Sequence, residues 1–166
     1  LIESMPQILT QVPDAHLLLV GQGPYRAHLE KLVTKHSLQE NVSFIGRIQY
    51  TDLPGYICVG DIFAMPSRSR FGGLEVEGLG IVYLEASACG LPVIAGESGG
   101  APDAVIEGVT GFVVDGTSTE QIANRAIQLL RDEKLRRGMG SAGRAWIEKE
   151  WRWQIWASKF SDLLAR

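Results

Sequence analysis

Residues 16–46 have the sequence HLLLVGQGPYRAHLEKLVTKHSLQENVSFIG. The apolar run at 16–20 predicts a buried strand, and the Gly-Gln-Gly-Pro that follows it predicts a turn. A helix is expected over 25–36 and a second strand over 42–45. Strands that are apolar throughout and alternate with helices of this length are typical of a parallel sheet covered on both faces.

The same alternation continues along the rest of the chain. Further strands are expected at 62–65, 92–95 and 111–114, and further helices at 51–58, 80–88, 118–131, 135–146 and 151–164. The chain opens as a helix ending near Pro13, because apolar residues recur at intervals of three and four from Leu1 to Val12. Each helix of such a fold follows a strand, so we expect at least one strand upstream of Leu1. The prediction is one α/β domain over residues 1–166, a doubly wound parallel sheet with helices on both faces, truncated at its N-terminal edge.

Length and composition are those of one ordinary soluble domain. The chain has 166 residues, of which 45% are hydrophobic and 21% charged, and a formal net charge of -3. No apolar run reaches the ~20 residues that span a bilayer, and residues 1–6 lack the layout of a signal peptide, so a cytoplasmic protein is expected. Cys58 and Cys89 have no metal-ligand spacing to each other or to a histidine, so we expect no metal site. The slightly acidic balance argues against nucleic acid as a partner.

Ligands of open α/β sheets bind outside the carboxyl ends of the strands, so chemistry is expected in the loops that follow them. The first such loop, Gly21-Gln22-Gly23, has the start of a dinucleotide fingerprint, but Arg26 stands where the third glycine would be. A turn that ends the strand explains this loop better than NAD binding does. The chain also lacks the GxxxxGK[ST] pattern of a P-loop.

The most informative loop is RSRFGGLEVEGLGIVYLEA, residues 68–86, which runs into a helix beginning near Gly80. N–H groups at a helix N-terminus bind phosphate, and the glycines let the backbone approach such a ligand. Glu77 precedes this helix, where a favourable charge on the helix dipole is the simpler explanation of a carboxylate. Glu85 lies in an apolar run that predicts burial, so it needs a partner, which the vicinal hydroxyls of a ribose would supply.

These two glutamates carry a family resemblance. The segment EGLGIVYLE at 77–85 resembles the two-glutamate motif of the family-4 retaining glycosyltransferases, and this chain resembles the Rossmann-like C-terminal half of their GT-B fold. Further matching stretches are VSFIG at 42–46, DIFAMPS at 61–67, CGLPV at 89–93, GGAP at 99–102 and GVTGFVVD at 108–115. The segment from Phe71 to Gly80 is most similar to the phosphatidylinositol mannosyltransferase type, which uses GDP-mannose.

The resemblance implies roles for the residues that match the motif. Glu77 would be the catalytic residue, contacting hydroxyls of the donor sugar, and Glu85 would hold the ribose. The other implied donor-binding residues are Gly46 and Arg47 at the base, Ser67 and Arg68 in the cleft, and Gly78, Leu79, Gly80, Ile81 and Val82 along the sugar and diphosphate. Ordinary solvent exposure is an equal alternative for Arg68. Asp103 stands where the family commonly has Glu, and it is given no role.

The resemblance also implies that this chain is the nucleotide-sugar-binding part of a longer protein. The family's diphosphate-clamping Arg and Lys, and its N-terminal acceptor-binding domain, have no counterpart in residues 1–166. The chain alone is therefore expected to be inactive. The intact protein is expected to transfer a hexose, mannose from GDP-mannose, to a lipid or glycan hydroxyl with retention. It would need no metal or other cofactor, and would work in the cytoplasm or peripherally at the inner face of the membrane.

Two other functions fit the same pattern. A non-catalytic nucleotide-binding module would need the ribose carboxylate but has no reason for a second carboxylate at the sugar. A nucleotide-sugar epimerase of the same fold would bind the same donor. An assay for epimerised free donor separates this enzyme from a transferase.

All four tryptophans, at 146, 151, 153 and 156, lie within eleven residues near the C-terminus. A locally packed aromatic helix is one explanation. Residues 131–152 carry seven Lys or Arg against four Asp or Glu, an excess too small to favour a membrane contact over a protein contact. Because the last helix of the resembling family crosses to the other domain, we expect the helix at about 151–164 to pack on the absent N-terminal domain.

Overall fold

Every strand and helix expected from the sequence is present in the computed structural model, which describes residues 1–165. The strands are β1 (Leu17–Val20), β2 (Val42–Gly46), β3 (Phe63–Met65), β4 (Val93–Gly96) and β5 (Gly111–Val114). The α-helices are α1 (Met5–Gln11), α2 (Arg26–Lys35), α3 (Leu53–Cys58), α4 (Ile81–Ala88), α5 (Thr119–Arg131), α6 (Glu133–Glu150) and α7 (Trp153–Leu164). Short 3₁₀ helices are η1 (Ile2–Ser4), η2 (Tyr50–Asp52), η3 (Phe71–Gly73) and η4 (Ala101–Ala104). The predicted domain extends to Arg166, which lies outside the described residues.

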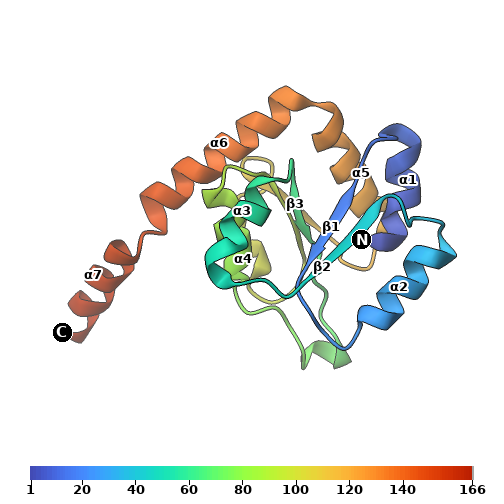
Figure 1. Ribbon diagram of the computed structural model, residues 1–166. Coiled ribbons are helices and arrows are strands. Elements are labelled where there is room, and N and C mark those ends of the chain that lie inside the picture. Colours follow the sequence, from blue (N-terminus) through green and yellow to red (C-terminus); the bar gives the residue numbers. More distant parts are fainter. Residues whose placement is uncertain (166) are drawn as a thin grey trace.

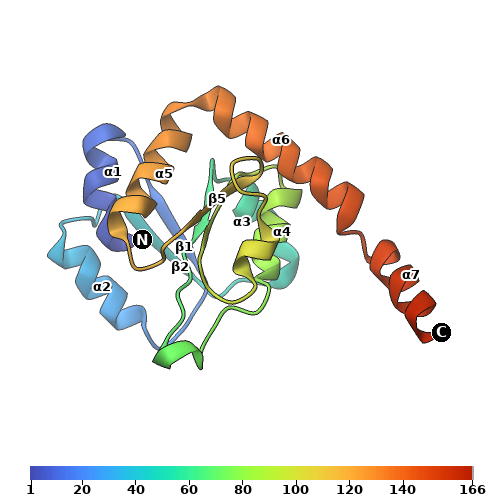
Figure 2. The same ribbon diagram turned by 180° about the vertical axis from the view of Figure 1, so that it is seen from behind.

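The prediction of a parallel sheet with helices on both faces is confirmed. Within residues 1–165 the strand pairings β1–β2, β3–β4 and β4–β5 are all parallel. Successive side chains of a strand point to opposite faces. Along β4, Ile94 packs into an apolar cluster with α1, α2 and α5, whereas Val93 and Ala95 pack into a second cluster with α3 and α4. Figures 1 and 2 show these two groups of helices on opposite sides of the strands.

The hydrogen bonding of the sheet is interrupted. β1 pairs with β2 in one ladder, β3, β4 and β5 form another, and no pairing joins the two within the described part of the chain. Both ladders nevertheless pack into one core, to which β1 contributes Leu17 and Leu19 and β3 contributes Ala64. β4, with a neighbour on each side, is buried along its whole length, whereas β1 and β3 are mostly half-buried.

The last helix leaves the rest of the molecule. In Figure 1, α7 continues outward from the end of α6, and the C-terminus points away from the sheet. Trp151 lies between Trp146 and Trp156, at ring-centroid distances of 5.6 Å from each. The indole N–H of Trp156 also donates to the carbonyl of Glu150 at 2.9 Å, which fixes the bend between α6 and α7. Among residues 1–165, no helix combines the length and the apolarity that crossing a membrane requires.

Candidate functional site

The start of α4 can accept an anion at the carboxyl end of the sheet. Gly80 precedes this helix in the left-handed conformation, with φ of +73°. The N–H groups of Gly80, Ile81 and Val82 donate to no protein acceptor within residues 1–165. Free N–H groups of this kind, together with the partial positive charge of the helix end, stabilise a bound phosphate. Gly78 and Leu79 complete the approach to the helix, and the side chain of Leu79 packs inward against the core.

Tyr83 ties the start of α4 to the end of β3. Its side chain is fully buried, and its hydroxyl donates to the carbonyl of Met65 at 2.7 Å. Because a phenol has one proton, the hydroxyl of Ser67, 2.9 Å away, must donate to Tyr83. Burial raises the pKa of Tyr83. The sequence interpretation placed Ser67 in the ligand cleft, which stays a prediction. The structure adds that its hydroxyl bonds to Tyr83, whose role no spacing in the sequence indicated.

The backbone around Glu77 is held by the loop that follows β4. The N–H of Glu77 donates to the hydroxyl of Ser98 at 3.1 Å, and the N–H of Gly100 donates to the carbonyl of Gly78 at 2.8 Å. Gly99 has φ of +53°, and a Cβ there would overlap the carbonyl oxygen of Glu77. The Gly-Gly pair is therefore needed for this close approach. The Glu77 carboxylate is half-buried and has no hydrogen-bond or ion-pair partner in the part of the chain that the structure describes.

Glu85 already has a partner, which the sequence interpretation missed. The hydroxyl of Tyr50, on η2, donates to Oε1 of Glu85 at 2.9 Å. This bond and the negative charge of Glu85 raise the pKa of Tyr50. The apolar run predicted burial, and Glu85 is half-buried, but on the same helix Ile81 is 66% exposed and Ala88 is exposed too. The helix buries the side that carries Tyr83 and Ala86. At its N-terminal end, the opposite side, which carries Ile81, is exposed to solvent.

The ends of β1 and β2 form the other side of the candidate site. The N–H of Gly21 donates to the carbonyl of Gly46 at 2.8 Å, so the two strand ends lie together, and Arg47 follows them with an exposed side chain. The guanidinium of Arg26 lies over the ring of Phe44, 5.2 Å from its centroid. Its Nε donates to Glu30 at 2.8 Å. Arg26, which the sequence interpretation treated only as a break in the dinucleotide fingerprint, thus adds positive charge beside Gly46.

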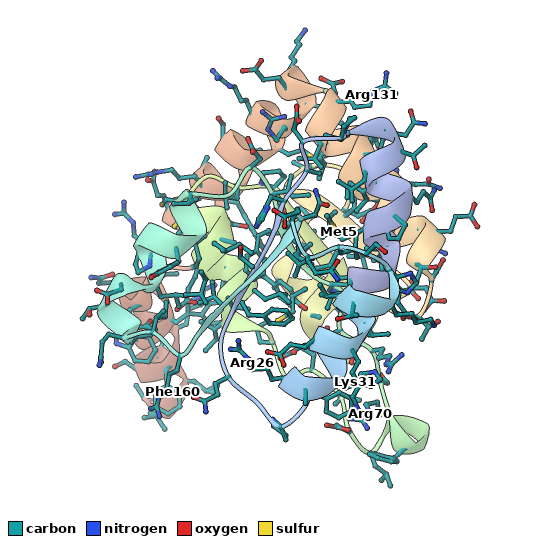
Figure 3. The ribbon with its side chains drawn as sticks, turned by 45° about the vertical axis from the view of Figure 1, so that its right-hand side comes forward. Met5, Arg26, Lys31, Arg70, Arg131 and Phe160 are labelled. Carbon is teal, nitrogen blue, oxygen red and sulfur yellow. The ribbon has the colours of Figure 1, made fainter. Side chains whose placement is uncertain are left out.

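Positive side chains gather at this end of the molecule. In Figure 3, Arg26, Lys31 and Arg70 lie at the end opposite Arg131. Arg68 is exposed and lies near Leu1. Two of these side chains are ion-paired, Arg26 with Glu30 at 2.8 Å and Arg70 with Glu75 at 3.2 Å, so their charge is partly compensated.

The two cysteines are neighbours, although they lie far apart in the sequence. Both thiols are free, with Cys58 at the end of α3 exposed and Cys89 at the end of α4 half-buried. Burial and a hydrogen bond with the Cys58 thiol raise the pKa of Cys89 to about 11. Residues 1–165 contain no group of three or more His, Cys, Asp or Glu side chains that could hold a metal ion.

Comparison of the sequence with known proteins identifies its family. Residues 1–146 match the family described as glycosyl transferases group 1. The chain is 50% identical, over 164 residues, to a GDP-mannose-dependent monoacylated alpha-(1-6)-phosphatidylinositol monomannoside mannosyltransferase of Corynebacterium glutamicum. It is 46% identical, over 165 residues, to a GDP-mannose-dependent alpha-(1-6)-phosphatidylinositol monomannoside mannosyltransferase of Mycolicibacterium smegmatis. The chain is covered to 99% in both cases but spans only 42% and 43% of those proteins.

A solved structure supports the same assignment. Anabaena Alr3699/HepE in complex with UDP-glucose superposes with a TM-score of 0.86 at 26% identity, covering 99% of this chain and 44% of that one. Because 99% of this chain is covered, the match includes both Glu77 and α4, on which Glu85 lies. Together with the match over residues 1–146, it means that the chain belongs to the group 1 glycosyl transferases and has the fold of the corresponding part of their GT-B members.

Proposed function

We propose that this chain is the donor-binding part of a longer retaining glycosyltransferase, which transfers mannose from GDP-mannose to a hydroxyl of a lipid or glycan. The observation that carries this proposal is the start of α4, where unpartnered N–H groups lie between the half-buried carboxylates Glu77 and Glu85. The two mannosyltransferases that are 46–50% identical to the chain support the choice of GDP-mannose.

In this proposal each part of the site has one task. The N–H groups of Gly80, Ile81 and Val82 bind the diphosphate and stabilise its charge as it leaves the sugar. Glu85 accepts hydrogen bonds from the ribose, and Glu77 accepts them from hydroxyls of the donor sugar. Gly46 and Arg47 border the base. Because N–H groups and arginines supply the positive charge, we propose that binding does not depend on a divalent cation.

We also propose that the longer protein completes the sheet. β1 and β3 each have one hydrogen-bonded neighbour, and both are mostly half-buried while β4 is buried throughout. One additional parallel strand, supplied by residues upstream of Leu1, would fit between the two ladders. The positive charges that clamp the diphosphate would follow this strand, close to Arg68, which lies near Leu1.

The same longer protein would cover α7. Trp153 is 82% exposed and Phe160 61% exposed, although both are large apolar residues. We propose that an acceptor-binding N-terminal domain packs on them, since such a domain interface is where exposed apolar side chains at a chain end are expected. For a lipid acceptor, we propose that the enzyme works peripherally at the cytoplasmic face of a membrane.

Calorimetric titration of the chain with GDP, UDP and ADP, with and without EDTA, tests the donor site. We expect GDP to bind in the presence of EDTA, and more tightly than the other two. Binding only with magnesium or manganese would contradict the proposed metal independence, and no binding of any diphosphate would contradict the function. In the longer protein, transfer of mannose to an acceptor separates a transferase from a non-catalytic module, and an epimerised free donor would identify an epimerase.

A further inference from the structure

We propose that Tyr50 is a positioning residue for the nucleotide ribose. Its hydroxyl holds one oxygen of the Glu85 carboxylate, so that the remaining acceptor positions of that carboxylate are directed at the ribose hydroxyls. This inference rests on the proposed function, because it assumes that Glu85 receives a ribose. It assigns a task to a residue outside the two-glutamate motif.

The first step is the contact itself. Tyr50 is 76% exposed, so its ring is not held in place by burial in the core. Its hydroxyl nevertheless lies 2.9 Å from Oε1 of Glu85, a residue 35 positions further along the chain. A hydrogen bond to an ionised acceptor is about twice as strong as one between neutral groups. The bond therefore connects η2 with α4 at the point where the proposed nucleotide lies.

The second step is the capacity of the carboxylate. A phenol has one proton, so Tyr50 donates it to Glu85. An ionised carboxylate has about four acceptor positions on its two oxygens, so one bond from Tyr50 leaves room for two ribose hydroxyls. The bond to Glu85 raises the pKa of Tyr50, so the phenol keeps its proton over the neutral range and can donate it. Tyr50 and a ribose can therefore share Glu85 and need not compete for it.

The third step is the place of Tyr50 in the chain. It follows Gly46 and Arg47, the residues proposed to border the base, within the same loop. Without a partner, a half-buried glutamate on a helix can adopt several rotamers, and ordering one of them upon binding costs free energy. The bond from Tyr50 removes part of this cost before the nucleotide arrives. It also couples the loop at the base to the carboxylate at the ribose.

The test compares GDP with 2′,3′-dideoxy-GDP, which lacks the hydroxyls that Glu85 would bind. The dissociation constants of both are measured for the unmodified chain, Tyr50→Phe, Glu85→Gln and the control Tyr56→Phe. Tyr56 lies on α3, and its hydroxyl has no hydrogen-bond partner within residues 1–165. Tyr50→Phe keeps the ring and removes only the donor. Since both nucleotides share the base and the diphosphate, the ratio of their two dissociation constants reports the contribution of the ribose hydroxyls alone.

The unmodified chain should bind GDP about ten- to hundredfold more tightly than the dideoxy nucleotide. Tyr50→Phe should reduce this ratio by about three- to tenfold, Glu85→Gln should remove most of it, and Tyr56→Phe should leave it unchanged. An unchanged ratio in Tyr50→Phe overturns the inference while the proposed function stands. Tighter GDP binding by Tyr50→Phe also overturns it, because Tyr50 would then compete with the ribose. Equal affinity of the unmodified chain for the two nucleotides, or binding of neither, overturns the proposed role of Glu85 together with the inference.

Discussion

The ring of Tyr83 fills the space that a side chain at Gly80 would need. A Cβ at position 80 would overlap the ring carbons, and the backbone there has the left-handed φ that side chains disfavour. Gly80, which precedes α4, therefore leaves the space that the buried ring of Tyr83 occupies one turn later. The open N–H groups of the helix depend on this pair.

Replacing Gly80 by alanine should therefore destabilise the chain. We expect the free energy of unfolding to fall by about 2–4 kcal/mol, from the backbone conformation and the overlap with Tyr83 together. Urea unfolding measures the loss. Gly138→Ala is the matched control: it lies within α6 with open space around it, so its free energy of unfolding should stay constant or rise by up to about 1 kcal/mol. A Gly80→Ala chain as stable as the control would contradict the proposed match.

Removing the hydroxyl of Tyr83 should weaken the connection between β3 and α4. Tyr83→Phe leaves the carbonyl of Met65 and the hydroxyl of Ser67 without this partner, and we expect a loss of about 1–3 kcal/mol in the free energy of unfolding. Tyr56→Phe should lose almost nothing, because no hydrogen bond of that hydroxyl exists among the described residues. Equal losses in the two variants would show that the bond does not contribute to stability.

Substitutions of Glu77 and Glu85 should have different effects on the affinity for GDP. Glu85→Gln should lower the affinity for GDP by about ten- to hundredfold, because a charge-assisted hydrogen bond to the ribose is lost. Glu77→Gln should leave the affinity for GDP nearly unchanged and, in the longer protein, lower the rate of transfer, because GDP has no sugar for Glu77 to contact. Calorimetry and a transfer assay check the two effects. Equal losses of GDP affinity would contradict the assignment.

The stability of the chain should depend on alkaline pH through Cys89. Its pKa is about 11 in the folded chain and about 8.5 in an unfolded one, so the folded state holds the proton more tightly. The stabilising effect is complete below about pH 8.5 and is lost as pH rises toward 11. Unfolding of the unmodified chain and of Cys89→Ala, measured from pH 8 to pH 11, isolates this effect from the titration of other groups. A parallel decline in both chains would refute it.

Removing α7 should have little effect on the rest of the chain. Phe160, Leu163 and Leu164 are each more than 60% exposed, so their loss removes few buried contacts. A chain of residues 1–151 should keep its free energy of unfolding and bind GDP as before. It should also associate less, as measured by light scattering. A full chain that is monomeric, with all four tryptophans shielded from acrylamide, would argue against α7 as an interface.

Local sequence patterns predicted the elements, because the spacing of apolar residues determines which face of a helix or strand can be buried. The position of Glu77 and Glu85 around the start of α4 also followed from local sequence, since both lie within nine residues of one another. Contacts between distant segments could not be predicted in this way. The Tyr50–Glu85 bond spans 35 positions, and the Cys58–Cys89 pair is produced by the packing of α3 on α4.

The burial of α4 shows a second limit of sequence patterns. Its run of apolar residues suggested a helix enclosed on most sides, yet Ile81 is exposed. The apolar composition of a helix does not show which neighbouring element covers each of its faces. The face of α4 that carries Ile81 borders the candidate ligand site. The sequence predicted that a strand upstream of Leu1 is missing, but not that its place lies between β1 and β3, because strand order is decided by pairings between distant segments.

The facing edges of the two ladders, on β1 and β3, have a practical consequence for handling the chain by itself. The N–H and C=O groups along the edge of a strand are a template on which another chain can add a strand of its own. Here β1 and β3 both have such an edge, in the middle of an apolar core. At high concentration the chain is therefore expected to exchange or add strands between copies. Aggregation during purification would arise in the sheet as well as at the exposed C-terminal helix.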